Sequence, residues 1–465
     1  MGELSKTDAV ATRFARSREG LLTSAEPVDW IVLLLPTVFA IRTFSTTAAL
    51  LALGLLGFAA YARKSDLTRT IQAGPFLLLI GSTLLVLTRP EPKGDLLFFL
   101  LLVALVVRLV MTINAGAIIA SLVDGAGIYL ALNVISYAAG LRSPGAADRI
   151  GDIRDSGGTL RILFPFSPSL EIAPTIASVY IGATAFLIFQ RGWTRRSLRL
   201  AGLAAAFAVI VQGGNRTALF AAVALPVAVI FFPFIARWVG IVVTVFASIS
   251  ALVLPALVAL VQPALLAFLS FIAPERTTRA ADVGTLNNRS IIWRKSTEYW
   301  MNWVDSEFNW LFGFGQQGQY RSGASMSYAQ ALSSTVRHPE LASMHNSFLQ
   351  QLFDGGIVGW LLLTVAILWA TIRLSRYRTR WGAAGLAAIV AMVTLLLNSM
   401  TQVTIAPGSS QDSFWLLVVL IGVACQSPPD ELPETVRELE FAEPNTTGLS
   451  SASSPPPPDV SKEIV

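Results

Sequence analysis

Charged and titratable side chains are scarce in this sequence. Only 14% of its 465 residues are charged, and it contains two histidines and one cysteine. The single cysteine, Cys425, excludes an intramolecular disulfide, and the sequence holds neither a Cys/His cluster with metal-ligand spacing nor a Walker phosphate-binding loop. We therefore expect no metal and no cofactor, and nothing indicates a nucleic-acid partner.

Hydrophobic residues make up 54% of the chain, and its mean hydropathy is +0.61. Several stretches run for about 18 to 22 residues with few charges, which is the length that a helix needs to cross a bilayer. Lipid offers no hydrogen-bond partner to the backbone, so these stretches are predicted to be helices. The sequence predicts an all-α polytopic membrane protein with about twelve transmembrane helices, near residues 28–43, 44–62, 73–89, 95–113, 115–139, 171–190, 199–214, 217–236, 238–261, 348–373, 382–404 and 412–425.

Lysine and arginine indicate the orientation of these helices. Alternate loops hold basic clusters at 63–69, 191–199 and 373–380, whereas the loops between them are poorer in lysine and arginine. Basic loops face the cytoplasm in most membrane proteins, which predicts a multi-pass protein with both termini in the cytoplasm.

The same pattern divides the chain into five regions. We expect a polar cytoplasmic segment at 1–26 leading into an uncleaved first helix, helices one to nine at 27–261, and a large extracytoplasmic loop at 262–345 before the tenth helix. Its aromatic residues predict helical pieces at the membrane interface or over the mouth of the bundle. Helices ten to twelve follow at 346–425. The acidic, Ser/Pro-rich end at 426–465 is predicted to be a disordered cytoplasmic tail.

Both histidines, His338 and His345, lie in the large loop. His345 precedes an apolar run, and Ser343 is the predicted N-cap, which places His345 in the first helical turn at the outer surface. A lone histidine is more often a hydrogen-bonded interface residue than a catalytic one. A catalytic role for His345 therefore depends on which other polar residues lie near it.

Three arginines are candidates for a site shared with His345. Arg216 follows Asn215 in a short polar segment between two apolar runs, which we call the polar knot. The simpler alternative to a functional role is an arginine that extends its charged group to the membrane interface. Arg289 and Arg294 lie five residues apart, on different faces if helical, and an exposed basic helix face is the alternative for them. Downstream, the segment 310–315 contains two glycines and could form only a loop corner.

Three of these segments together resemble the O-antigen ligase and polymerase family. The first has His345-Asn346, nine residues, Gly356, two residues and Gly359. The second, at 213–219, is similar to the family's small/polar-Arg segment. The third is 289–293 followed by 311–315, which resembles the family's Arg-x-x-x-Trp and Leu-Phe-Gly-x-Gly segment. The resemblance covers roughly residues 200–370, in the family's order and on its span-loop-span plan, and the long acidic tail departs from it.

The resemblance implies a glycosyltransferase in the bacterial cytoplasmic membrane. The donor would be a glycan on an undecaprenyl diphosphate carrier, and the acceptor a hydroxyl group of a glycan or glycolipid at the outer face. Cell-envelope polysaccharide assembly proteins are candidate further partners. A guanidinium group can bind two phosphate oxygens at once, which suits arginine to the diphosphate. Histidine can accept the proton of the acceptor hydroxyl near neutral pH. Attack from the side opposite the diphosphate would invert the anomeric centre. The expected catalytic residues are His345, Arg289 and Arg216, and the expected substrate-binding residues are Arg294, Asn346 and Asn215.

Two alternatives stay open. A polymerase would join one lipid-linked repeat to another, and the motifs do not separate it from a ligase. A transporter or flippase is the alternative of another class, and Asp124, inside the fifth predicted span, is the residue that favours it. A charge paired within the helix bundle is the simpler explanation of Asp124.

Overall fold

The structure of this chain is a computed structural model, and it describes residues 28–63, 69–89, 93–144, 161–189, 192–232, 234–272, 289–333, 338–407 and 413–427. The predicted N-terminal segment 1–26 and nearly all of the predicted tail at 426–465 lie outside the described residues. In the described part, every regular element is a helix, and the β pairing is an isolated bridge between Ile71 and Gln426. The structure thus confirms the all-α class.

Among the described residues, six helical segments are long and apolar enough to cross a membrane: Gly94–Thr112 in α5 (Lys93–Thr112), α6 (Ala115–Ala138), α8 (Trp193–Gly213), Ile235–Leu254 in α10 (Ile235–Ile272), α16 (Ser347–Tyr377) and α17 (Gly382–Ser399). Shorter apolar helices occupy the other predicted spans: α2 (Trp30–Arg42), α3 (Thr46–Ala62), α4 (Gly74–Leu87), α7 (Ile172–Leu187), α9 (Arg216–Phe231) and α18 (Phe414–Cys425). At 1.5 Å per residue, a helix of 12 residues such as α18 rises only about 18 Å. The structure therefore shows a bundle of apolar helices. The number of complete transmembrane spans, twelve, stays a prediction.

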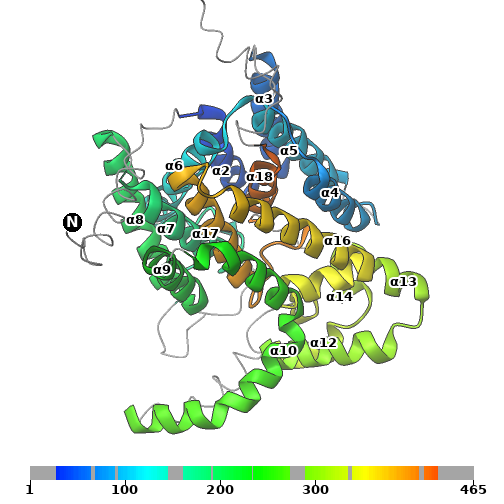
Figure 1. The fold of residues 1–465 in the computed structure, drawn as a ribbon. Helices are drawn as coiled ribbons and strands as arrows, with labels where there is room; N and C mark the ends of the chain where they lie inside the picture. The colour runs from blue at the N-terminus through cyan, green and yellow to red at the C-terminus, as the bar shows by residue number, and fades with distance from the viewer. Residues whose placement is uncertain are drawn as a thin grey trace, which may run out of the picture. The chain divides into compact units, whose positions relative to one another are not determined.

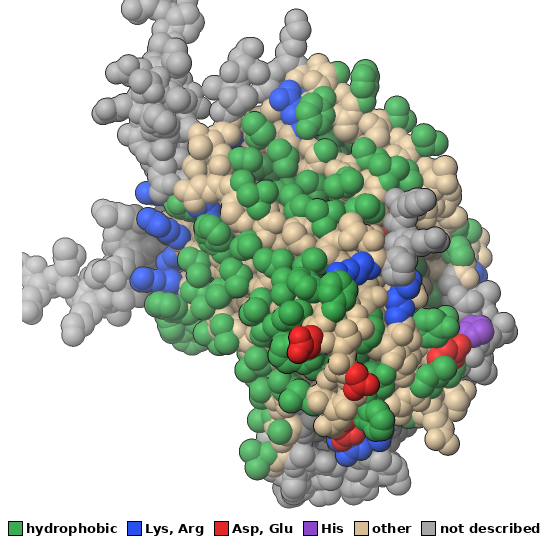
Figure 2. Space-filling model, turned by 90° about the vertical axis from the view of Figure 1, so that its right-hand side faces the viewer, with side chains coloured by type: hydrophobic (Ala, Val, Ile, Leu, Met, Phe, Trp, Pro, Cys, Tyr) green, Lys and Arg blue, Asp and Glu red, His purple; other side chains and the backbone are tan. Residues whose placement is uncertain are grey.

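The helices bury one continuous apolar core and expose apolar side chains around it. In Figure 1, α17 and α18 lie within the bundle, and almost every residue of both helices is buried. Outer helices show the reverse pattern, since Leu51, Leu55 and Phe58 of α3 are exposed. Hydrophobic side chains also cover much of the face in Figure 2, with few charges among them. An exposed apolar belt around a packed core is what a lipid-facing protein requires.

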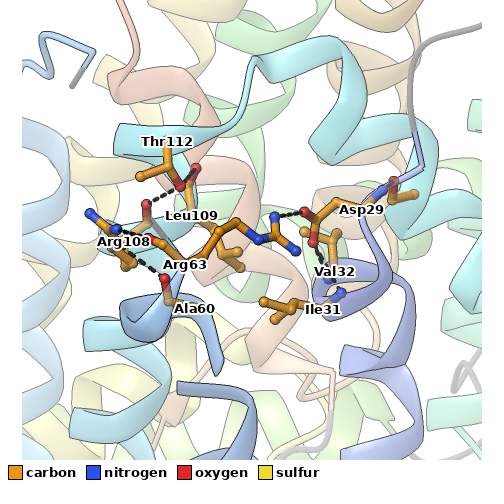
Figure 3. Close-up of polar contacts among 9 residues, drawn as sticks. Asp29, Ile31, Val32, Ala60, Arg63, Arg108, Leu109 and Thr112 are labelled. Atoms are coloured by element: carbon orange, nitrogen blue, oxygen red, sulfur yellow. Dashed lines mark hydrogen bonds and ion pairs between the residues drawn. The ribbon is translucent and has the colours of Figure 1, made fainter. Parts of the chain in front are cut away.

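Arginines at one end of the bundle hold helix ends together (Figure 3). Arg63, at the end of α3, pairs with Asp29, which caps α2 by accepting from Ile31 N and Val32 N. Arg108 of α5 donates to the carbonyls of Ala60 and Arg63 at 3.1 and 2.8 Å. These groups satisfy carbonyls and amides that a helix terminus leaves unpaired.

Asp124 of α6 belongs to a similar arrangement. Its carboxylate pairs with Arg195 and Arg199 of α8, each at 2.7 Å. Asp124 and Arg199 are almost completely buried. The pairing matches the simpler explanation of Asp124, a charge paired within the helix bundle.

In the predicted large loop 262–345, residues 262–272 continue α10, and short helices follow from residue 289: α12 (Arg289–Trp303), α13 (Glu307–Phe312), α14 (Gly318–Arg321), α15 (Met326–Leu332) and the 3₁₀ helix η3 (Pro339–Leu341). We call the described residues 289–333 and 338–341 the cap. In Figure 1, α12, α13 and α14 lie together at one side of the bundle, and α13 and α14 pack against α16. Trp293 and Trp300 of α12 are buried in a second, smaller apolar cluster that includes Leu349 and Phe353 of α16.

The cap docks where α16 bends. Gly356 has φ of 66° and ψ of −170°, which interrupts the helix. The carbonyls of Phe353 and Asp354 at the bend accept hydrogen bonds from Phe314 N at 2.8 Å and Gly315 N at 2.9 Å. Backbone groups released by the kink are thereby satisfied by the cap, as a buried kink requires.

Glycines permit this close docking. A Cβ at Gly313, whose φ is +74°, would lie 2.5 Å from the carbonyl oxygen of Asp354, and a Cβ at Gly356 would lie 2.3 Å from that of Leu311. No side chain fits such a gap. The Leu-Phe-Gly-Phe-Gly segment and the glycines after Asp354 therefore form one interlocking contact, rather than a free loop corner.

Candidate functional site

The N-terminus of α16 is fixed from several directions. Asn346 is its N-cap, with Oδ1 accepting from Phe348 N at 3.0 Å and Leu349 N at 2.9 Å. The prediction of Ser343 as N-cap is wrong, because the helix starts three residues later than that cap requires. Asn346 Nδ2 donates to Ser250 Oγ at 2.8 Å and to Met400 O at 2.9 Å. All four hydrogen-bonding positions of this amide are thus used within the protein, which gives Asn346 a structural role in place of the expected substrate contact.

Ser347 extends the same anchor. Its hydroxyl donates to Gln402 O at 3.0 Å and accepts from Thr404 N at 2.8 Å and Ile405 N at 3.2 Å. Side-chain oxygens thus satisfy backbone amides beyond α17. The start of α16 and the segment 400–405 consequently form one rigid corner.

His345 stands just before this corner, in a strained backbone conformation. Its φ is +50°, in the left-handed region that non-glycine residues seldom occupy. Its neighbour Met344 is held at both backbone groups, since Met344 N donates to Gln350 Oε1 and Met344 O accepts from Trp293 Nε1 at 2.9 Å. Strain of this kind persists where the surroundings enforce it, and it is concentrated at functional sites.

The imidazole of His345 lies against a carboxylate. His345 Nδ1 is 3.2 Å from Glu171 Oε1, and the two side chains are 27% and 19% exposed. The two atoms lie within ion-pair distance, but Nδ1 makes no aligned hydrogen bond to an atom of the described residues. Glu171 immediately precedes the first residue of α7, so it lies at the helix end and not within the apolar segment. With Nδ1 turned to Glu171, Nε2 is the ring nitrogen left for a substrate proton.

The charges of two arginines, Arg289 and Arg161, act on Glu171. Desolvation raises the pKa of this carboxyl, but the charges of His345, Arg289 and Arg161 outweigh it and lower the pKa to about 2. Burial lowers the pKa of Arg289, and the charge of Glu171 opposes that effect. The result is a permanent carboxylate with positive groups around it. We call His345, Glu171, Arg289 and Arg161 the His345 cluster.

Arg161 is tied to the end of α8. Its Nε donates to Gly213 O at 2.8 Å, and Ile162 N donates to Gln212 O at 2.9 Å. The side chain of Arg161 also packs on Gly214, whose φ is +63°. The polar knot before α9 thus holds Arg161 in place.

The other predicted site residues lie outside the described contacts of the cluster. Arg216 is exposed at the first position of α9, and it is not among the charges that shift the pKa of Glu171. Asn215 caps α9, because its Oδ1 accepts from Ala218 N at 3.0 Å. Arg294 is 65% exposed and lies 3.9 Å from Glu298 one turn along α12. Of the six predicted residues, His345 and Arg289 are the two whose charges act on the described carboxylate of Glu171.

Sequence reasoning missed Glu171 and Arg161. Glu171 could have been singled out, because it is an acidic residue at the end of a predicted span. That end lies on the same predicted side of the membrane as His345. An ionisable group there is costly unless paired, so a search for its partner would have led to the histidine. Arg161 had no comparable signal within the loop 140–170. Comparison of the chain with models of known protein families and with curated protein sequences finds no match.

Proposed function

We propose that this chain is a membrane glycosyltransferase that moves a glycan from a lipid diphosphate carrier to an acceptor hydroxyl. The observation that carries the proposal is the 3.2 Å contact of His345 with Glu171 at the fixed N-terminus of α16. Arg289 supports it, because its charge helps to lower the pKa of Glu171. The resemblance of three sequence segments to the O-antigen ligase and polymerase family supports undecaprenyl diphosphate as the carrier. The site would face the outer side of the bacterial cytoplasmic membrane.

His345 acts as the general base in this proposal. The acceptor hydroxyl oxygen attacks the anomeric carbon of the donor sugar, and its proton passes to Nε2 of His345. Glu171 at Nδ1 orients the ring and stabilises the imidazolium that forms, as a carboxylate does for a catalytic histidine. The new glycosidic bond forms on the face opposite the leaving group, which inverts the anomeric centre.

Arg289 acts on the leaving group. The bond between the anomeric carbon and the phosphate oxygen breaks, and its electron pair leaves with the lipid diphosphate. Guanidinium groups stabilise that developing charge through paired hydrogen bonds, without a metal or nucleotide. Arg161 is a second guanidinium in the same cluster, and Arg216 is a candidate further along the donor, since it lies two residues beyond the Gly214 that Arg161 contacts.

The acceptor decides between ligase and polymerase. A ligase hands the finished glycan to a different molecule, whereas a polymerase adds it to another lipid-linked repeat. The test is deletion of the gene, followed by analysis of lipid-linked glycans and complementation with wild type or His345→Ala. Accumulation of finished polymer indicates a ligase, and accumulation of single repeats indicates a polymerase. Unchanged lipid-linked glycans after deletion would refute the transferase.

A further inference from the structure

A line of buried amide and carboxyl groups runs along α16 toward His345. Gln350 and Asp354, one turn apart, are completely buried. Gln350 Nε2 donates to Asp354 Oδ1 at 2.8 Å and to Gln319 Oε1 of the cap at 2.6 Å. Gln350 Oε1 accepts from Met344 N at 3.2 Å. The line therefore ends at the backbone of the residue before His345.

The two acceptors at Nε2 fix the direction of the Gln350 amide. An amide turned by 180° would place its oxygen against the oxygens of Gln319 and Asp354 and its NH₂ against the N–H of Met344. Both contacts would be repulsive. Asp354 and Gln319 thus determine that an acceptor, and not a donor, faces Met344.

Asp354 connects this line to the docked cap. Its Oδ1 also accepts from Gly318 N at 2.7 Å, and its backbone carbonyl accepts from Gly315 N. Gly318 has no room for a side chain, because a Cβ there would lie 2.3 Å from Phe353 O. Asp354 therefore joins the cap segment 313–319, the kink of α16 and Gln350.

We propose that Gln350 and Asp354 are positioning residues, which couple the docking of the cap at the α16 kink to the backbone that holds His345 in its left-handed conformation. Neither residue reaches the reacting atoms. Met344 is held by Gln350 at its N–H and by Trp293 at its carbonyl, so loss of Gln350 releases one of two restraints. A strained residue relaxes when its restraint is lost, because the left-handed conformation is unfavourable for a residue with a side chain.

The proposal has a direct spectroscopic test, because the chain has two histidines and His338 is an exposed residue paired with Glu340. A His338→Asn background leaves His345 as the single histidine, so ¹⁵N-histidine labelling of the purified full chain gives one imidazole to observe. We expect Gln350→Met to shift or broaden this signal. Gln351→Met is the matched control, since Gln351 is equally buried on the same helix but donates to Ser82 Oγ instead. An unchanged signal in a folded Gln350→Met protein would overturn the proposal.

Activity gives a second readout, which rests on the proposed function. Gln350→Met should lower kcat by about 10- to 100-fold with KM for the donor little changed, the scale expected for a misplaced catalytic group. Asp354→Asn keeps an Oδ1 acceptor for Gly318 N and Gln350 Nε2, so it should retain the wild-type His345 signal and most activity, whereas Asp354→Leu should lose both. Loss of activity in Asp354→Asn with an unchanged His345 signal would contradict positioning. If the wild-type protein shows no transferase activity and Gln350→Met still shifts the His345 signal, the proposed function is refuted and the positioning role of Gln350 stands.

Discussion

At the scale of single residues, the His345 cluster combines a strained histidine with a carboxylate that stays ionised. Glu171 keeps its charge because its neighbours are positive, although desolvation alone would favour the neutral acid. The sequence marks Glu171 as a charge that needs a partner on the side of His345, but it does not show the contact itself. Glu171 and His345 lie in distant segments, and only the packing of α7 near the start of α16 brings them together.

Arg289 should not be replaceable by lysine. Lysine preserves the charge but offers a point donor in place of a planar fork, so Arg289→Lys should lower transfer by about 10- to 100-fold, as expected for loss of a charge-assisted hydrogen bond. Arg294→Lys is the matched comparison on the same helix, because Arg294 is exposed and lies near Glu298 outside the cluster. Transfer rates of both variants from a lipid-linked donor check this. Equal rates would remove Arg289 from the leaving-group site.

Glu171 should make stability depend on pH in acid. Its pKa in the folded protein, about 2, lies below the ordinary value of 4.5, so its contribution is complete above about pH 4.5 and is lost as the pH falls toward 2. The measurement is the midpoint of thermal unfolding of wild type and Glu171→Gln between pH 3 and 7. The wild type should lose stability relative to Glu171→Gln as the pH falls below about 4.5. A stability difference that stays constant between pH 5 and 3 would contradict this electrostatic account.

At the scale of helices, the sequence predicts the elements well and their contacts poorly. The twelve apolar helices coincide with the predicted segments to within a few residues at most ends, because the length and polarity of an apolar run are local properties. The kink at Gly356 and its contact with Gly313 depend on two segments meeting. A pair of glycines in sequence does not reveal which backbone it will touch.

The glycine contact between the cap and α16 should be sensitive to a single methyl group. Gly313→Ala adds an overlap with Asp354 O and Gly356 N, so it should destabilise the protein by clearly more than the backbone strain alone. Gly323→Ala is the control within the cap. Its φ is also positive, at +82°, but the nearest atom to its Cβ is 3.7 Å away. Thermal unfolding in detergent compares the two, and equal losses would mean that the docked contact adds nothing.

At the scale of the whole molecule, an outer-leaflet donor can reach the His345 cluster only if the cluster and the cap lie outside the cytoplasm. Single cysteines in a Cys425→Ser background report this in intact cells through a membrane-impermeant thiol reagent. Ser327→Cys, exposed on α15, should react, whereas Ser197→Cys, exposed near the start of α8, should react only after permeabilisation. Both positions are exposed, so a difference reports sidedness and not burial. The reverse pattern would place the cluster on the wrong side for an outer-leaflet donor.

The central claim is that His345 catalyses glycan transfer, and the most direct measurement is transfer from a purified lipid-linked donor by the detergent-solubilised protein. His345→Ala should lower turnover by about 10² to 10⁴, the usual contribution of a positioned general base, with donor binding little changed. His338→Ala should stay near the wild-type rate, because His338 is exposed and contacts Glu340 away from the cluster. Near-normal turnover in a folded His345→Ala protein would contradict the account.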